Sequence, residues 1–218
     1  MKRLSFSALL LLFVVSLSAQ LRWDVKAGMS VANMTQMEEG AKFGYTVGIG
    51  ADYAFSNMFS LQTGINFTSK GTREVDVEDD YRNYNKEVFK VFSHYAELPV
   101  LAAVKFQVTD DFKVLVNAGP YFAMGLAGKE EYTNTAIQGV DYSYDLFKDS
   151  KDNKALMNRF DTGLQFGVGT ELNDHFLINL TGQCGFISPY NEPYDRMYGD
   201  DGKSPKNLNF MITAGYRF

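Results

Sequence analysis

Two histidines, His94 and His175, are the side chains of this chain best suited to acid–base chemistry near neutral pH. A hydrolase would need such a histidine beside a serine nucleophile and an acidic side chain. No serine elbow or histidine pair appears. His94 is expected near the outer end of a strand and His175 after a periplasmic turn, so the two would lie at opposite membrane faces. The sequence therefore predicts a protein that is not an enzyme, with no catalytic residue.

Other patterns that could bind a ligand are incomplete. Gly48-x-Gly50 and Gly167-x-Gly169 lack the third glycine and the following helix of a dinucleotide site. The acidic runs 76–80 and 200–202 offer the carboxylate oxygens that Ca²⁺ prefers, but neither has the spacing of a dedicated calcium loop. We therefore expect no cofactor and no metal site, and we interpret the acidic runs as a solvated surface, leaving calcium binding by the loops open.

Alternation of side-chain type every two residues dominates the rest of the chain. Over 42–55 the odd positions are apolar or aromatic, whereas the even positions are mostly glycine, polar or charged. This period of two is that of a β-strand with one apolar face and one polar face. The pattern predicts eight strands, near 22–34, 42–55, 59–69, 93–108, 112–127, 157–172, 175–187 and 207–218.

The connections between these expected strands alternate in length. The second, fourth and sixth connections are tight, whereas those at about 71–92, 129–156 and 188–206 are long. Short periplasmic turns alternating with long extracellular loops are typical of transmembrane barrels. We therefore expect an all-β chain that forms an eight-stranded antiparallel transmembrane β-barrel, although the first outward connection, about 35–41, is short for an extracellular loop.

The first residues have the pattern of an export signal. Lys2 and Arg3 precede an apolar run from Ala8 to Val15, and Ala19 is a small residue suited to cleavage. We expect a signal peptide over 1–19 and a single barrel domain over 20–218. The four outward segments hold 18 acidic and 11 basic residues, and this acidity argues against a nucleic-acid partner.

Charged residues of the expected strands fall on the polar face, which in an eight-stranded barrel points into a narrow interior. Because buried charges must be paired, the pattern predicts a salt-bridge network that fills the lumen and leaves no open solute pore. Its expected members are Arg22, Asp24, Lys26, Asp52, Glu97, Lys105, Asp161, Glu171 and Arg217. The remaining basic residues of this face are Lys42, Lys70, Lys113 and Arg159. We expect Glu97 to be the most consequential lumen carboxylate, with Lys70 on the neighbouring strand as its candidate partner.

Several segments resemble the Bacteroidota outer-membrane β-barrel family that includes the PorT-like proteins. The most specific of them is Tyr95-Ala96-Glu97-Leu98-Pro99. The motifs occur in the family's order, and the others are Val25–Ser30, Gly48–Tyr53, Ala118–Tyr121, Phe166–Gly169 and the closing Gly215–Phe218. The resemblance implies an eight-stranded barrel in the outer membrane, inserted by the barrel-assembly machinery. It also implies that Tyr216 and Phe218, on the apolar face of the last strand, are the assembly signal.

The sequence leaves three functions open. The first is a non-enzymatic barrel whose acidic, tyrosine-rich loops bind a protein partner or cover the cell surface, since tyrosine suits both recognition surfaces and the aromatic girdle of a barrel. The second is a subunit of a protein-secretion or transport assembly, as in one PorT-like branch. The third is a lipid-modifying enzyme. Under all three, we expect outer-membrane lipids as direct neighbours.

Overall fold

The computed structural model describes residues 20–35, 40–80, 83–134, 141–149, 154–192 and 203–218, with side chains described outside 72–89 and 132–142. The expected signal peptide, 1–19, lies outside these residues. The strands of this part of the chain are β1 (Leu21–Met34), β2 (Gly40–Ala54), β3 (Phe59–Asp80), β4 (Asn83–Thr109), β5 (Phe112–Asn134), β6 (Asp141–Asp145), β7 (Phe160–Leu172), β8 (Phe176–Gly185) and β9 (Asn207–Arg217). No helix in the described ranges is long and apolar enough to cross a membrane.

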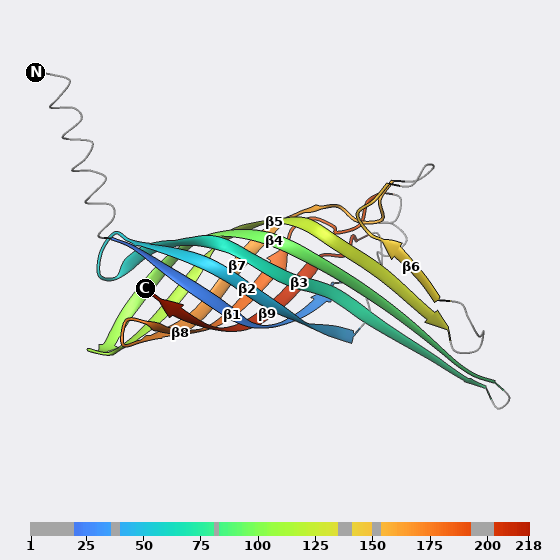
Figure 1. Ribbon diagram of the computed structural model, residues 1–218, viewed down its shortest axis with the longest axis horizontal. Coiled ribbons are helices and arrows are strands. Elements are labelled where there is room, and N and C mark those ends of the chain that lie inside the picture. The colour runs from blue at the N-terminus through green and yellow to red at the C-terminus, as the bar shows by residue number, and fades with distance from the viewer. Residues whose placement is uncertain (1–19, 36–39, 81–82, 135–140, 150–153, 193–202) are drawn as a thin grey trace, which may run out of the picture.

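Eight of these strands close into one antiparallel barrel (Figure 1). Each is hydrogen-bonded to its neighbour in the sequence, except that β5 pairs with β7, and β1 closes the ring by pairing with β9. The first and last strands must pair in this way because an open edge in lipid would leave backbone groups without partners. The expected eight-stranded antiparallel barrel is confirmed. β6 lies outside the ring and pairs only with the outward end of β5.

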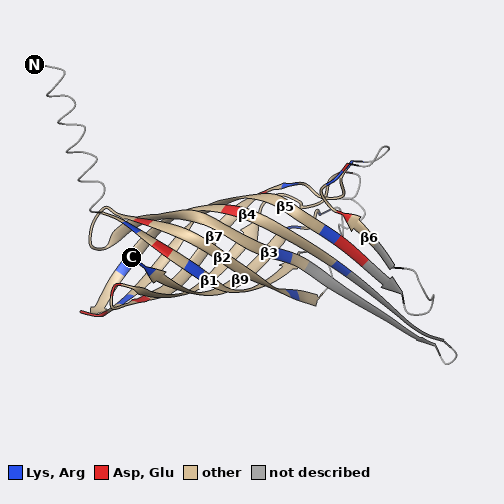
Figure 2. Cartoon of the chain, in the orientation of Figure 1, with Lys and Arg blue, Asp and Glu red and all other residues tan. Residues whose placement is uncertain are grey.

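The two faces of the strands separate as the alternation predicted. Val47, Ile49 and Phe166 point away from the barrel with 44%, 57% and 50% of their surface exposed. Asp52 and Asp161, on the opposite faces of the same strands, are 1% exposed. Figure 2 marks the charged residues along the strands. An apolar outer wall around a polar interior is the arrangement that a bilayer requires.

Three tight turns lie at one end of the barrel, together with the start of β1 and the end of β9 (Figure 1). The turn between β7 and β8 places Asn173 and Asp174 at φ values of 50° and 61°, and the His175 N–H donates a hydrogen bond to the Leu172 carbonyl at 3.1 Å. Asparagine and aspartate tolerate this left-handed backbone, which matches the twist of a hairpin. We call this end periplasmic and the opposite end outward.

The expected long loops at 71–92 and 129–156 are wrong in extent. β3 and β4 continue as a paired hairpin to Asp80 and Asn83, and β5 continues to Asn134, where β6 joins it. The alternation expected for the barrel stops in these segments because they have left the bilayer, yet backbone pairing holds them extended. Figure 1 shows β3, β4 and β5 reaching well past the other strands at the outward end.

Candidate functional site

The outward half of the lumen is built around one buried lysine, Lys70 on β3. Its Nζ lies 2.7 Å from Glu97 Oε1 on β4 and 3.3 Å from Asp161 Oδ2 on β7. It also faces the rings of Tyr121 and Tyr95, at 4.8 and 5.3 Å from their centroids. All three charged side chains are at most 2% exposed. Two carboxylates and two aromatic faces therefore surround a single cation.

Neutral side chains donate hydrogen bonds to one oxygen of each of these carboxylates. Gln183 and Thr68 donate to Glu97 Oε2 at 3.0 and 3.2 Å. Asn207 and the Tyr121 hydroxyl donate to Asp161 Oδ2 at 3.1 and 3.2 Å. Buried ions are tolerated only when such bonds replace those lost from water. We call Lys70, Glu97 and Asp161, with these donors, the outward cluster.

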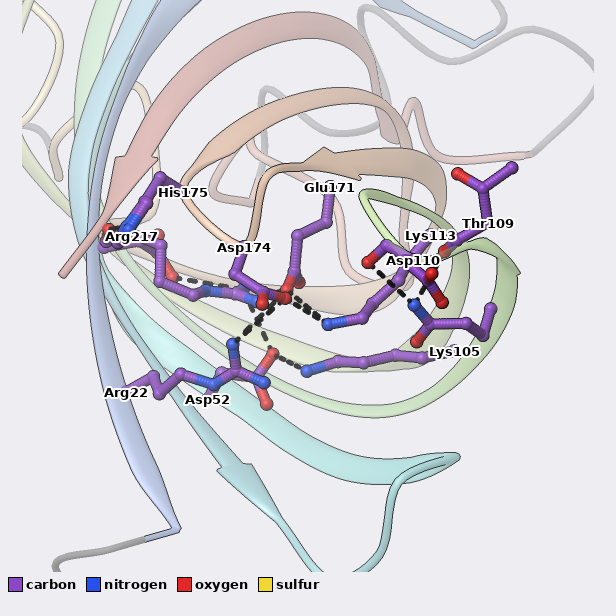
Figure 3. A network of polar contacts seen from close by, with 12 residues as sticks. Arg22, Asp52, Lys105, Thr109, Asp110, Lys113, Glu171, Asp174, His175 and Arg217 are labelled. Atoms are coloured by element: carbon purple, nitrogen blue, oxygen red, sulfur yellow. Dashed lines mark hydrogen bonds and ion pairs between the residues drawn. The ribbon is translucent and has the colours of Figure 1, made fainter.

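The periplasmic half of the lumen is organised by Arg217, near the end of β9 (Figure 3). Its guanidinium contacts Glu171 on β7, and it lies 3.1 Å from Asp52 on β2 and 3.7 Å from Asp24 on β1. Lys105 of β4 adds a second cation, 2.7 Å from the Asp52 carboxylate. We call this group the periplasmic cluster. It links five strands by their charges alone.

A ring of charges continues the periplasmic cluster to the turns (Figure 3). Arg22 and Lys113 lie 3.3 and 3.4 Å from Glu171, and Lys113 also contacts Asp174 in the β7–β8 turn. The hydrogen bond from Lys113 holds the pKa of Asp174 below its usual value. The Asp174 carboxylate therefore becomes protonated only at a lower pH than an isolated aspartate would.

A cavity of about 60 Å³ borders the periplasmic cluster at Asp24 and Arg217 and is lined by amides and hydroxyls together with apolar side chains such as Leu101 and Leu115. Of the nine residues expected in the lumen network, Lys26 is the one for which the described residues supply no ion pair, and it lines this cavity with Asp24. A space of this size holds only a few water molecules. Glycines make room here, because a Cβ at Gly50 would lie 2.4 Å from the Asp24 carboxylate.

The outward mouth of the lumen is covered by an apolar cluster that we call the cap. Phe147, from the segment between β6 and β7, packs edge-on against Tyr95 with ring centroids 5.9 Å apart. Its ring lies over Gly125 and Gly128, where an added Cβ would come within 2.5 and 2.9 Å of it. The other buried members are Met34, Val91, Tyr121, Ala123, Leu146, Met157 and Tyr190.

Arg159 connects Phe147 of this cap to β5. Its guanidinium donates to the Gly125 and Phe147 carbonyls at 3.0 and 3.1 Å and lies 5.3 Å from the Phe147 ring. The placement of Arg159 on the lumen face is therefore wrong. Lys42 departs in the same way, because its amine reaches across the wall to Phe92 instead of pointing into the lumen. Both residues lie at the outward end, where the alternation of apolar and polar side chains no longer indicates which face of the strand points into the lumen.

Phe147→Ala should release the cap without opening the barrel. Removing a buried phenylalanine ring from a packed cluster costs about 3–5 kcal/mol, so local opening of the segment between β6 and β7 should become at least about tenfold more frequent. Limited proteolysis of the folded barrel would show faster cleavage there. Phe160→Ala, which removes a lipid-facing ring that is 46% exposed, is the matched control and should leave the cleavage rate unchanged.

The remaining sequence candidates are dispersed. His94 stacks on Phe67 on the outer wall, whereas His175 sits at the periplasmic turn with Nδ1 2.7 Å from the Arg217 carbonyl. Within the described ranges, no three His, Cys, Asp or Glu side chains could hold a metal ion. The acidic runs 76–80 and 200–202 have no described side chains. Of the loop tyrosines, Tyr190 is buried in the cap and Tyr144 is 60% exposed.

Tyr216 and Phe218 lie at the periplasmic end and point away from the barrel, with 40% and 69% of their surface exposed. Their rings pack edge-to-face, with centroids 5.5 Å apart. The Phe218 N–H donates to the Trp23 carbonyl of β1 at 2.9 Å, so the last residue is fixed to the first strand. The two aromatic rings therefore lie where an interfacial girdle would place them.

The sequence did not reveal the cap. Tyr95 and Tyr121 are aromatic residues on the lumen side of β4 and β5, and Phe147 lies in a segment expected to be a loop. The usable signal was Gly125-x-x-Gly128, because paired glycines on one strand indicate that something approaches the backbone closely.

Comparisons with known proteins agree with this architecture. Residues 16–190 match the model of the outer membrane protein beta-barrel domain family. No curated protein matches the chain significantly.

Solved structures with a similar fold include Ail, the attachment invasion locus protein of Yersinia pestis, which is 16% identical with a TM-score of 0.38 and a match covering 90% of this chain and 98% of that one. Neisserial surface protein A is 13% identical, with a TM-score of 0.43 and coverage of 91% and 97%. OprG from Pseudomonas aeruginosa is 12% identical, with a TM-score of 0.39 and coverage of 90% and 95%. At these values the likeness carries no argument about function.

The family match spans most of the chain, and the closed barrel presents an apolar wall around a charged interior. The protein is thus an outer-membrane protein, and its chain belongs to the outer membrane protein beta-barrel domain family.

Proposed function

We propose that this protein is a non-enzymatic, non-conducting barrel that binds a protein partner at the cell surface through its outward arm. The arm consists of the β3–β4 hairpin beyond the Arg73–Lys90 pair, flanked by the outward end of β5 and by β6. We do not propose the lumen as the binding site, because ion pairs fill it and the cap covers its outward mouth.

The observation that carries the proposal is the backbone edge of β3 beyond Arg73, for which the described strands supply a partner on one side only. The last pair between β2 and β3 is Gly40 with Arg73. From Glu74 to Asp80, β3 pairs with β4 only, as far as the described strands show. Unpaired N–H and C=O groups along such an edge are a template on which another chain can add a strand.

The composition of this edge indicates which partner would fit. Residues 74–80 read Glu-Val-Asp-Val-Glu-Asp-Asp, with five acidic residues in seven. Acidic edges repel copies of themselves, which protects against aggregation. They attract a basic segment and speed its encounter. We therefore infer an extended, basic segment of another protein as the partner.

Removing the arm tests this proposal. Joining Arg73 to Lys90 through Asn-Gly would replace the hairpin by a two-residue turn at a pair that is already in register. The barrel without the arm should keep its heat-modifiable migration on gels. It should no longer cross-link to the partner protein that the intact chain captures. The matched control keeps the hairpin and changes Asp76, Glu78, Asp79 and Asp80 to their amides, which should weaken capture at low salt without abolishing it. Undiminished capture by the armless barrel would contradict the proposal.

The identity of the captured protein decides between a surface-binding role and membership in a secretion or transport assembly. The lipid-modifying alternative has its own test, because lipid A from a strain lacking the protein should be unchanged if the barrel is not an enzyme. His94 and His175 support the non-enzymatic assignment, since they lie at opposite ends of the barrel.

A further inference from the structure

The outer wall of β4 and β5 changes character over a short distance at its outward end. Leu98, Phe122 and Met124 are exposed apolar side chains on this wall, 46%, 41% and 48% accessible. Further outward, the cross-strand pairs are Phe92 with Lys129 and Lys90 with Glu131. The wall thus passes from hydrocarbon-like to cationic, as expected where lipid tails give way to head groups.

Lys42 of β2 adds a third lysine to this outward part of the β4–β5 wall, which it reaches across β3. Its Nζ donates a hydrogen bond to the Val91 carbonyl of β4 at 2.8 Å and lies 3.4 Å from the centroid of the Phe92 ring. The route crosses β3 at Gly71, which has a φ of +149°. A Cβ there would lie 3.0 Å from the Lys42 amine and 2.0 Å from the Val91 oxygen, so glycine is required. The amine keeps two further N–H donors for a ligand.

A cleft of about 330 Å³ lies beside these cations. Phe92 and His94 form one side, and the segment from Ala127 to Lys129, with Glu131, forms the other. Below it, His94 stacks on Phe67 with centroids 5.8 Å apart and rings within 9° of parallel, and Tyr45 lies 6.0 Å from His94. Such an aromatic shelf marks the head-group level of a membrane protein.

We propose that this cleft, with Lys42, Lys90 and Lys129 around Phe92, binds the phosphate group of an outer-leaflet lipid. Glu131 lies opposite Lys90 and Asp145 lies opposite Lys129 in the register, and Asp145 is itself paired with Lys148 at 2.9 Å. The three lysines therefore keep a net positive charge that an anion can neutralise. Ammonium groups bind phosphate as point charges. The cleft opens sideways above the apolar wall, so a lipid phosphate arrives there with its acyl chains already lying along Leu98 and Phe122.

Native mass spectrometry of the full barrel, released from detergent after incubation with dioleoyl phosphatidic acid or with purified lipid A, tests the site. The double variant Lys42→Gln/Lys129→Gln should bind each lipid at least about tenfold more weakly than the unchanged chain, in line with two lost charge-assisted contacts. Dioleoyl phosphatidylcholine, whose phosphate is masked by choline, should bind weakly to both. Lys129→Gln alone removes an exposed side chain and reports the effect without disturbing the wall.

The matched control is Lys154→Gln/Lys206→Gln, which removes two exposed cations that do not line the cleft. It should retain the affinity of the unchanged chain. Equal losses in the two double variants would show a general charge effect and overturn the site. Displacement of the lipid by inorganic phosphate at equal concentration would also overturn it, because the site would then serve free phosphate.

Discussion

Lys70→Met should lower the free energy of unfolding of the barrel by about 3–5 kcal/mol, the cost of breaking a buried ion pair from one side. The substitution leaves Glu97 and Asp161 facing each other without the cation that lies 2.7 and 3.3 Å from them. Urea unfolding in lipid vesicles, followed through the single tryptophan, Trp23, would measure the loss.

The same substitution at Lys148 is the control for this prediction. Lys148 forms an exposed pair with Asp145 at 2.9 Å, and exposed pairs contribute at most about 1 kcal/mol. Adding Glu97→Gln and Asp161→Asn to Lys70→Met should recover part of the stability, because the uncompensated charges are then gone. If Lys70→Met were no more damaging than Lys148→Met, the outward cluster would have no structural role.

Phe218→Ala should reduce the amount of barrel inserted in the outer membrane several-fold while barely changing the stability of what is inserted. The ring is 69% exposed at the periplasmic interface, where an aromatic side chain anchors only modestly. The backbone bond from Phe218 to Trp23 survives the substitution. Quantifying heat-modifiable protein in outer-membrane fractions, and its melting in detergent, separates the two effects.

Phe176→Ala provides the comparison for Phe218. Phe176 is also lipid-facing, 54% exposed, and its ring lies 5.5 Å from Tyr216. It is not at the chain end, so its loss should leave the inserted amount close to normal. A similar decrease for both variants would show that lipid-facing aromatics matter in general and that Phe218 carries no separate assembly signal.

The wall and lumen of the barrel could be predicted from sequence because lipid imposes a strict rule on every strand. A lysine or arginine on the outer face at mid-membrane costs about 2–4 kcal/mol, so the positions of Lys70 and Lys105 indicate which face is inside. The pairing of Lys70 with Glu97 followed from the same parity and from adjacency of their strands, and the structure contains it.

Outside the bilayer that rule no longer applies, and the prediction failed there. The extent of β3 and β4 beyond Lys70 depends on cross-strand backbone pairing, which leaves only a weak mark on side-chain type. The cap depends on tertiary contact between Phe147 and a strand about twenty residues earlier, at Gly125. Arg159 and Lys42 were misplaced for the same reason, since both follow local contacts.

The pairing of β1 with β9 constrains when the barrel can form. Asp24 lies opposite Arg217, so the ladder that closes the ring joins residues near the two ends of the described barrel. Contacts so distant in sequence form late, because closing a long loop costs entropy before any contact compensates for it. A chain missing its last strand would expose two unpaired edges to lipid and would also lack the Arg217 guanidinium that joins Asp24, Asp52 and Glu171. Closure of the barrel in the membrane must therefore wait until β9 has been exported.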